Sequence, residues 1–280
     1  MEHKHTLRDL MRVRLAKFAA VVLGVTIVMA VFAPWLAPYD PVKTKPWDSL
    51  HPPSSQYWLG ADRLGRDQLS RLIYGARVSL LIGVGGVGIA VLLGMFIGVT
   101  AGWYSGLLDE LLMRLMDGLS AFPALLLALS LVAITGSTVL NIILVVAVVG
   151  TPWVARVIRS QVLSLRERDF VRLAIVAGCS KKTIMRRHIL PNVVNSAVVL
   201  GTLMLGVVIV TEAALSFLGV GVPPPKPAWG LMLADGKKGL MAGYWWLTVL
   251  PGLCIMFMVL SANLIGDWLR VKLDPQLRQL

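Results

Sequence analysis

Residues 118–155 read GLSAFPALLLALSLVAITGSTVLNIILVVAVVGTPWVA, 38 consecutive positions without a charged side chain. A transmembrane helix needs about 20 mostly apolar residues, so this run is too long for one helix. Thr135, Gly136 and Ser137 interrupt its middle, and such turn-forming residues favour two antiparallel spans, the first beginning near Leu111. The sequence therefore predicts a membrane protein whose third and fourth spans are joined by a short turn.

The composition of the whole chain agrees with this interpretation. In 280 residues the set AVILMFWYC makes up 56% and charged residues only 15%, against about 25% charged residues in a typical soluble protein. The mean hydropathy is +0.74. These values exclude disordered, collagen-like and disulfide-scaffold classes. We predict an all-α integral membrane protein.

Four further apolar stretches raise the predicted number of transmembrane helices to six. Pro123, Pro152 and Pro251 can kink the third, fourth and sixth spans. The stretches are 18–36, 78–108, 193–218 and 239–266.

The distribution of cations predicts how the spans are oriented. Eighteen Lys and Arg residues fall on the side that holds both termini and nine on the opposite side. Because cations are retained on the cytoplasmic side, we expect both termini to be cytoplasmic. The predicted parts are a cytoplasmic N-terminal tail (1–17), the first transmembrane helix (18–36), an external loop with the segment LGADRLGRD (37–77), a five-helix core (78–266) that includes a long cytoplasmic loop (156–192), and a cytoplasmic C-terminal tail (267–280).

Two motifs that suggest nucleotide binding do not meet its requirements. Residues 83–88, GVGGVG, satisfy GxGxxG but lie inside an apolar span, where small residues let helices pack closely. Residues 178–183, GCSKKT, lack the glycine that a P-loop needs directly before its lysine, because Ser180 stands there. Cys179 and Cys254 form no metal or redox spacing. No catalytic residues and no metal ligands are predicted.

The loop 156–192 carries a possible interaction helix. Phe170, Leu173, Ala174, Ala177 and Gly178 are spaced so that they share one face of a helix, with cations on either side. This helix could rest on the membrane surface with its cations towards phospholipid, or it could dock into a groove on a soluble partner. Spacing alone favours neither.

Several blocks of sequence nevertheless resemble one family. Gly178 followed by His188, Pro191 and Asn192 resembles the "EAA" coupling loop of bacterial ABC importer permeases. The other blocks are similar to the C-type permeases of the dipeptide/oligopeptide/nickel family, and they occur in order: APWLAPYDP (33–41), WLGADRLGRD (58–67), SRLIYGAR (70–77), EAALSFLG (212–219), GVPPP (221–225), WG (229–230), NLIGDWLR (263–270) and LDP (273–275).

The resemblance implies a type I permease fold and a set of partners. These are a homologous B-type permease, two cytoplasmic ATP-binding subunits, an extracytoplasmic substrate-binding protein and membrane lipid, without nucleic acid. It implies no cofactor in this chain, since ATP and Mg would be bound by the partner subunits, and it places the protein in the bacterial inner membrane. The residues it assigns to ATPase coupling are Phe170, Leu173, Ala174, Ala177, Gly178, His188, Pro191 and Asn192. Arg172 and Leu173 depart from the acid and alanine expected there, and Asp169 could supply the acid.

The expected cargo is a dipeptide or oligopeptide, with nickel chelates or glutathione as alternatives. A secondary carrier that works alone is the rival from another class, but it predicts internal repeats and paired intramembrane charges. A membrane scaffold without transport is a second rival. Glu212 is the one acid deep in a predicted span, where an ionisable group needs a partner or a function. It could hydrogen-bond a neighbouring helix or line the substrate path.

Overall fold

The structure, a computed structural model, describes residues 7–273, with side chains from Arg14 onward except that of Lys238. The ends of both predicted tails, 1–6 and 274–280, lie outside the described residues. The elements are α1 (Leu7–Val31), α2 (Ala33–Leu36), the 3-10 turn η1 (Pro46–Asp48), α3 (Gln68–Tyr104), α4 (Gly106–Ser120), α5 (Ala124–Thr135), α6 (Val139–Arg166), α7 (Asp169–Val176), α8 (Lys181–Ile184), the π turn η2 (Met185–Ile189), α9 (Leu190–Phe217), α10 (Trp229–Leu240) and α11 (Trp246–Leu273).

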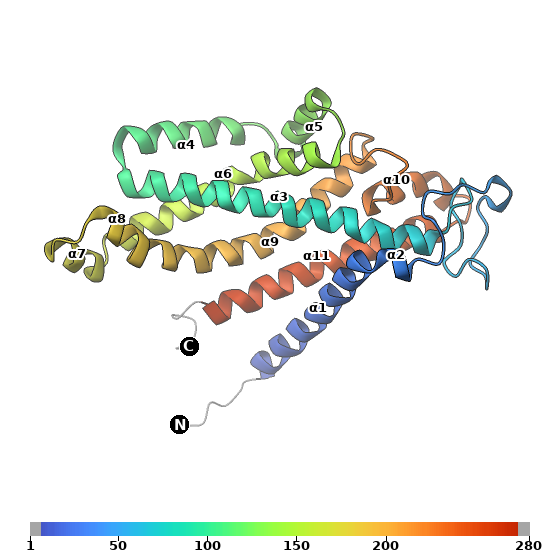
Figure 1. The fold of residues 1–280 in the computed structure, drawn as a ribbon, viewed down its shortest axis with the longest axis horizontal. Helices are drawn as coiled ribbons and strands as arrows, with labels where there is room; N and C mark the ends of the chain where they lie inside the picture. The colour runs from blue at the N-terminus through green and yellow to red at the C-terminus, as the bar shows by residue number, and fades with distance from the viewer. Residues whose placement is uncertain (1–6, 274–280) are drawn as a thin grey trace.

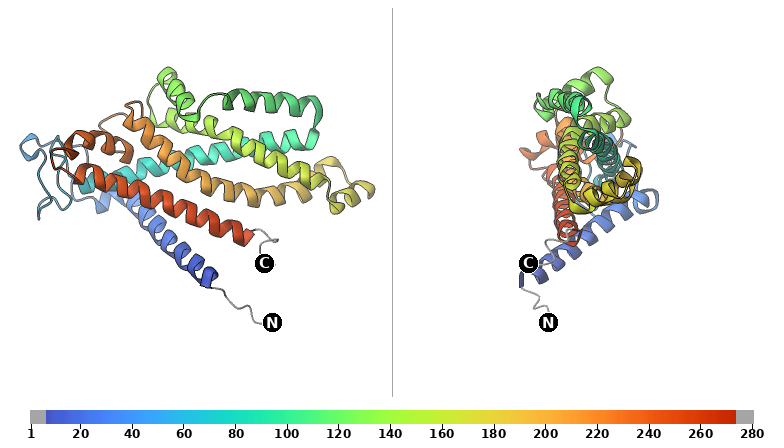
Figure 2. Two further views of the ribbon diagram at one scale, coloured as in Figure 1. Left: turned by 180° about the vertical axis from the view of Figure 1, so that it is seen from behind. Right: turned by 90° about the vertical axis from the view of Figure 1, so that its left-hand side faces the viewer.

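The long helices lie side by side along the longest axis of the molecule, as Figure 1 shows. Helices α3, α6, α9 and α11 form the bundle, and α1 diverges from it towards the N-terminus (Figures 1 and 2). One end carries α7 and α8, and the start of α1 and the end of α11 point towards it. The opposite end carries α2, α10 and the segment 37–67. The all-α prediction is confirmed, since the chain between residues 7 and 273 forms helices and no strand.

Five helices of the described chain are long and apolar enough to cross a membrane, and the number is six if a bent pair of helices counts as one span. The bent pair is α4 and α5, which meet at 88°. The sequence predicts one span here that Pro123 can kink, and the bend at this position is so sharp that the span is divided into two helices. Pro123 explains where it falls, because proline lacks an N–H and forces the preceding residue, Phe122, out of helical geometry.

Helix α3 begins ten residues before the predicted second span. Asp67 is its N-cap, and the Asp67 side chain accepts a hydrogen bond from the Ser70 backbone N–H at 2.8 Å. The charge-free run 78–108, from which the second span is predicted, covers only the apolar part of this helix. Its first turns lie in the segment that the sequence analysis assigned to the external loop, where Arg71 forms an ion pair with Asp62.

Helices α3 and α6 pack against each other along most of their length, through small residues. Gly94, Gly98 and Gly102 lie one helical turn apart on α3 and face α6. A Cβ atom at Gly98 would lie 2.9 Å from the Cβ of Ile158, and one at Gly102 would lie 2.8 Å from the Cβ of Val162. Glycine is therefore required for this close approach.

The glycines of the GVGGVG segment serve the same purpose in part. A Cβ at Gly83 would lie 3.0 Å from Leu205 of α9, and one at Gly86 would collide with Val146 of α6. Gly88 has nothing within 4 Å. The helix-packing interpretation thus holds for Gly83 and Gly86 but not for Gly88.

Candidate functional site

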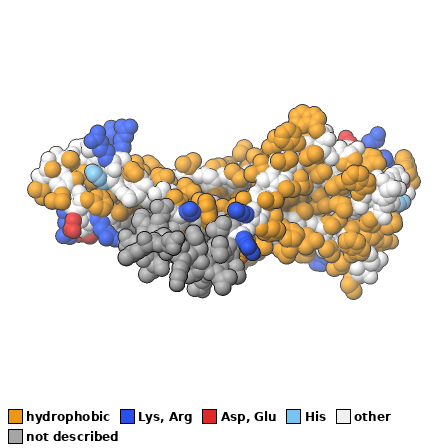
Figure 3. Space-filling model, turned by 90° about the horizontal axis from the view of Figure 1, so that it is seen from below, with side chains coloured by type: hydrophobic (Ala, Val, Ile, Leu, Met, Phe, Trp, Pro, Cys, Tyr) orange, Lys and Arg blue, Asp and Glu red, His pale blue; other side chains and the backbone are white. Residues whose placement is uncertain are grey.

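The predicted coupling loop forms one end of the molecule. It is shorter than expected, because α6 continues through Arg156 and ends only at Arg166. Figure 3 shows Lys and Arg side chains gathered at the end that carries α7 and α8. What remains between the two long helices is α7, a turn, α8 and the π turn that leads into α9.

Helix α7 is eight residues long and ends in a Schellman motif. The N–H of Gly178 donates to the Ile175 carbonyl and the N–H of Cys179 to the Ala174 carbonyl, both at 3.0 Å. Gly178 has φ +78°, which an L side chain rarely adopts. Ala177 and Gly178 therefore follow the helix, whereas the sequence analysis placed both on its face. Gly178 ends α7 and has open space around it.

The buried and exposed side chains of α7 do not follow the single shared face that the spacing predicts. Val171 is fully buried, and Ala174 packs against the hydrophobic core of the bundle. Phe170 and Leu173, expected on the same face as Ala174, are 42% and 67% exposed. Val176, which the sequence analysis missed, is 86% exposed. Its position three residues after Leu173 could have identified it, because such residues are neighbours on a helix.

A ring contact connects α7 to the start of α9. The rings of Phe170 and His188 lie with centroids 6.0 Å apart. His188 belongs to the π turn η2, and its carbonyl accepts a hydrogen bond from the Asn192 side-chain amide at 2.6 Å. Pro191 carries no N–H, so one α-helical bond is missing at this point.

Pro191 and Asn192, the last residues of the predicted loop 156–192, do not separate that loop from the span that follows. Residues 181–217 form one continuous helix that contains the π turn. Proline is tolerated here because it occupies the start of the α-helical part, where its missing N–H costs little. Helix therefore continues without a break from Lys181, within the predicted coupling loop, to Phe217.

Ion pairs fix the end of α6 that leads to α7. Arg159 binds both oxygens of Asp109 on α4, at 2.5 and 2.6 Å, and Arg156 binds Asp117 at 3.1 Å. Both arginines lie within α6 rather than in the loop to which the sequence analysis assigned them. On α4 itself, Arg114 forms an ion pair with Glu110, one helical turn away, at 2.6 Å.

Two more arginines act close to α7. Arg166, the last residue of α6, donates to the Gly102 carbonyl at 2.9 Å and to the Ser105 hydroxyl. Arg172 on α7 forms an ion pair with Glu167 at 2.6 Å, and this hydrogen bond raises the pKa of the guanidinium. The end of α6 next to α7 is thereby joined to the end of α3.

The opposite end of the molecule brings together several of the family-like blocks. Asp62 accepts from Arg66 Nε at 2.6 Å and lies 3.3 Å from Arg71 Nε. Arg66 Nη2 also lies 4.0 Å from Asp235 on α10. Burial raises the pKa of Asp235, and the charges of Arg71 and Arg66 oppose that rise. Buried charges need such partners, so this network fixes the segment 62–71 against α10.

Two tryptophans complete the packing at that end. Trp229 Nε1 donates to the Leu72 carbonyl at 3.0 Å, and Trp246 Nε1 donates to the Ala61 carbonyl at 3.2 Å. A Cβ at Gly75 would lie 2.8 Å from the Trp229 ring. The blocks 58–67, 70–77 and 229–230 thus share one packed region.

Glu212 faces the interior of the bundle and is only 1% exposed. Its Oε1 accepts a hydrogen bond from the Ser216 hydroxyl at 2.9 Å, and Ser216 Oγ accepts from the Val222 N–H at 3.3 Å. This chain of bonds ties the end of α9 to the loop that follows. Among the described residues no cluster of side chains could hold a metal ion.

Comparison with known proteins gives consistent matches. The family described as "Binding-protein-dependent transport system inner membrane component" matches residues 90–279, and "N-terminal TM domain of oligopeptide transport permease C" matches residues 4–53. The chain is 43% identical over 272 residues to the glutathione transport system permease proteins GsiD of Escherichia coli and Shigella boydii. The protein of that name from Shigella dysenteriae is 42% identical. Each match covers 97% of this chain and 89% of the relative.

Proposed function

Because the chain belongs to the family of binding-protein-dependent transport system inner membrane components, we propose that this multi-pass ABC importer permease subunit carries glutathione across the inner membrane. The observation that carries the choice of glutathione is 43% identity over 97% of the chain to permeases named for that substrate. It favours glutathione over a nickel chelate and over the general dipeptide or oligopeptide cargo that the motifs suggest.

We further propose that the exposed face of α7 docks on an ATP-binding subunit. Leu173 and Val176, neighbours on one face of the helix, are 67% and 86% exposed, and an apolar face of this kind on a short helix suits a groove in a soluble partner. The assigned residues Phe170, Ala177 and Gly178 border this face, while Ala174 supports it from the bundle side.

The contacts around α7 suggest how its movement would reach the membrane. Arg159 and Arg166 join α6 to α4 and α3, and the Phe170–His188 contact joins α7 to the continuous helix that includes α9. A displacement of α7 would therefore move these helices together as a rigid body. In this role His188, Pro191 and Asn192 connect α7 to the membrane helix.

The proposal includes the partners that an importer of this family requires. They are a homologous B-type permease, two ATP-binding subunits that bind ATP and Mg, an extracytoplasmic binding protein and membrane lipid. This chain then supplies part of the path and no ATPase site. The excess of Lys and Arg on the side of the termini supports a cytoplasmic location for α7 and both tails.

Uptake by the purified complex tests the choice of substrate. The complex that copurifies with the tagged chain would be placed in vesicles with its binding protein, and tritiated glutathione uptake would be measured with ATP inside. We expect ATP-dependent uptake that excess unlabelled glutathione abolishes and that excess dipeptide or nickel does not.

Two results would count against the proposal. Uptake of a dipeptide or of nickel, without uptake of glutathione, would make the chain part of a peptide or nickel importer instead. Uptake that runs on an ion gradient without ATP-binding subunits would favour the secondary carrier. A complex whose ATP-binding subunits carry an inactivating substitution provides the control for ATP dependence.

A further inference from the structure

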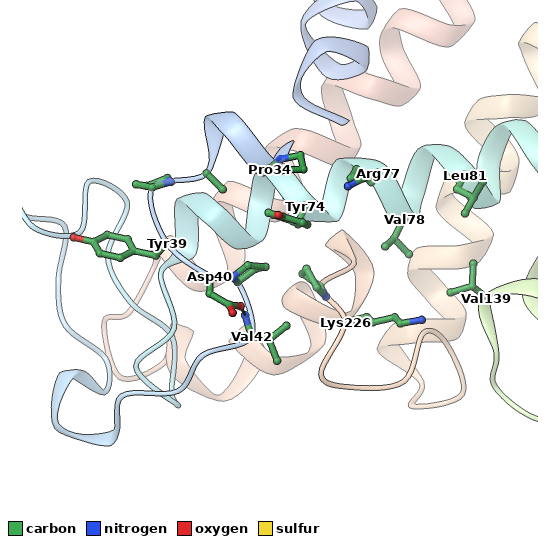
Figure 4. A pocket seen from close by; sticks show the side chains of 14 residues that line it. Pro34, Tyr39, Asp40, Val42, Tyr74, Arg77, Val78, Leu81, Val139 and Lys226 are labelled. Carbon is green, nitrogen blue, oxygen red and sulfur yellow. Dashed lines mark hydrogen bonds between the residues drawn. The ribbon is translucent and has the colours of Figure 1, made fainter. Parts of the chain in front are cut away.

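A cavity of about 820 Å³ lies at the end of the molecule opposite α7. Figure 4 shows its walls: the segment after α2, one face of α3, the start of α6 and the loop at Lys226. The volume lies within the range of about 300–1,000 Å³ that is typical of small-molecule sites. On the proposed orientation this end faces the side from which substrate arrives.

Three charged side chains line the cavity, two positive and one negative. Arg77 lies on α3, Lys226 in the loop before α10, and Asp40 in the segment after α2 (Figure 4). All three are exposed. Asp40 Oδ1 accepts from the Val42 N–H at 2.8 Å. Between residues 14 and 273, the side chains of Arg77 and Lys226 have no hydrogen bond or ion pair.

The lack of a described partner for Arg77 matters because of where this residue lies. It directly precedes the charge-free run 78–108, at the edge of the apolar part of α3. A cation at the edge of hydrocarbon is stabilised by an anion or by water. Val78, Leu81 and Val139 form the adjacent wall, so an anion bound in the cavity would have a partly apolar surrounding that strengthens its attraction to Arg77.

The walls around these charges are held in place. The Tyr39 N–H donates to Ser70 Oγ at 3.0 Å, and Arg71 Nη1 donates to the Pro41 carbonyl at 3.1 Å. Both bonds fix the segment after α2 to α3. Four prolines, at positions 34, 38, 41 and 227, add stiffness to the lining. A preformed site of this kind loses little entropy when a ligand binds.

Glutathione has the charges that complement this lining. It carries two carboxylates and one ammonium group, and the cavity presents two cations and one carboxylate. We propose that the cavity binds glutathione during transport, with Arg77 and Lys226 on the two carboxylates and Asp40 on the ammonium group. This inference rests on the proposed function, and it assigns selectivity for the substrate's charges to this subunit.

The test combines substitutions in the chain with a change in the substrate. Arg77→Gln and Lys226→Gln each remove one charge from an exposed position, and Lys43→Gln removes one from an exposed residue of the same end that lies outside the cavity lining. Binding of tritiated glutathione would be measured on the complex in nanodiscs without binding protein. Uptake would be measured with saturating binding protein. Glutathione monoethyl ester, which lacks one carboxylate, provides the second comparison.

We expect each cavity variant to weaken glutathione binding about tenfold, the loss of one charge-assisted hydrogen bond at a solvent-facing site. Lys43→Gln should bind as the native complex does. Esterification should weaken binding to the native complex, and one of the two cavity variants should show little further loss, because the partner of the missing carboxylate is already absent.

Contrary results overturn the inference and separate it from the proposed function. If the native complex imports glutathione and both cavity variants bind and import it normally, the cavity is not a substrate site although the function holds. If both variants change only the thermal stabilisation of the complex by anionic phospholipid, the cations bind lipid headgroups. If the native complex imports no glutathione, the inference falls together with the function.

Discussion

Arg159 on α6 forms two hydrogen bonds with the carboxylate of Asp109 on α4, at 2.5 and 2.6 Å, across 50 positions of sequence. The Asp109 side chain is only 14% exposed. This pair therefore joins α6, the helix that leads to α7, to α4. Its two-point geometry is the strong form of an arginine–carboxylate contact.

Replacing Arg159 should destabilise the chain more than replacing a surface arginine. For Arg159→Ala we expect a loss of about 1–2 kcal/mol, because Asp109 would remain partly buried without its partner. Arg114→Ala removes an ion pair whose side chains are 75% and 56% exposed and should cost little. Thermal unfolding of the purified complex measures both. Equal effects of the two substitutions would contradict the role assigned to Arg159.

A charge on the outward face of α7 should release the ATP-binding subunits. Val176→Asp places a carboxylate on a side chain that is 86% exposed, so the fold of the chain should persist. If this face is the docking surface, the desolvated charge should weaken the contact about tenfold or more. Trp47→Asp makes a similar change at an 82% exposed residue of the opposite end. The amount of ATP-binding subunit that copurifies should fall for Val176→Asp alone, and an equal fall for both variants would refute the assignment.

The packing of α3 on α6 should depend on glycine at position 98 but not at position 88. In Gly98→Ala the new Cβ would lie 2.5 Å from the Ala155 carbonyl oxygen, and such overpacking costs about 1–3 kcal/mol. Gly88→Ala meets nothing within 4 Å and should leave stability unchanged or slightly higher, since alanine favours helix. The yield of folded complex in mild detergent compares them. A Gly98→Ala variant as stable as Gly88→Ala would contradict the described helix contact.

Glu212 should act through its hydrogen bond to Ser216 rather than through its charge. In Glu212→Gln an amide oxygen can replace Oε1 as the acceptor, so uptake and stability should be retained. Glu212→Ala leaves the buried Ser216 hydroxyl without its acceptor, at a cost of about 1–3 kcal/mol. Loss of glutathione uptake in a stable Glu212→Gln complex would instead place Glu212 on the substrate path.

Patterns of charge predict the centres of the spans better than their ends. Helices α3 and α6 continue past their apolar runs and include cations with a partner close in space, as Arg71 has in Asp62 and Arg159 has in Asp109. Those partners are distant in sequence or lie in irregular segments, so the pattern of one span does not reveal them. The 88° bend between α4 and α5 escapes prediction for a related reason. Pro123 indicates a break, but the direction of α4 depends on its packing against α3 and α6.

The spacing predicts a short helix within the loop 156–192, and α7 lies there, but the spacing does not define which of its side chains are exposed. Helical spacing places Phe170, Ala174 and Gly178 on one face, on the assumption that the helix continues to Gly178. The positive φ of Gly178 ends the helix at Val176. The residues of the predicted face also differ in burial: Ala174 packs against the core of the bundle, whereas Phe170 is exposed. Which side of a short helix meets the bundle depends on tertiary contacts that spacing does not report.

Cysteine crosslinking at position 176 tests the central claim most directly. In a chain with Cys179→Ala and Cys254→Ala, Val176→Cys would be labelled in native membranes with a maleimide that carries a benzophenone group, beside Trp47→Cys at the opposite end. Irradiation would then join the benzophenone to C–H bonds of whatever protein lies next to it. If α7 is the docking element of an ABC importer permease, Val176→Cys should give a product of the chain with an ATP-binding subunit, and Trp47→Cys should give none. A product from Trp47→Cys, or none from Val176→Cys in a complex that still imports substrate, would contradict the account.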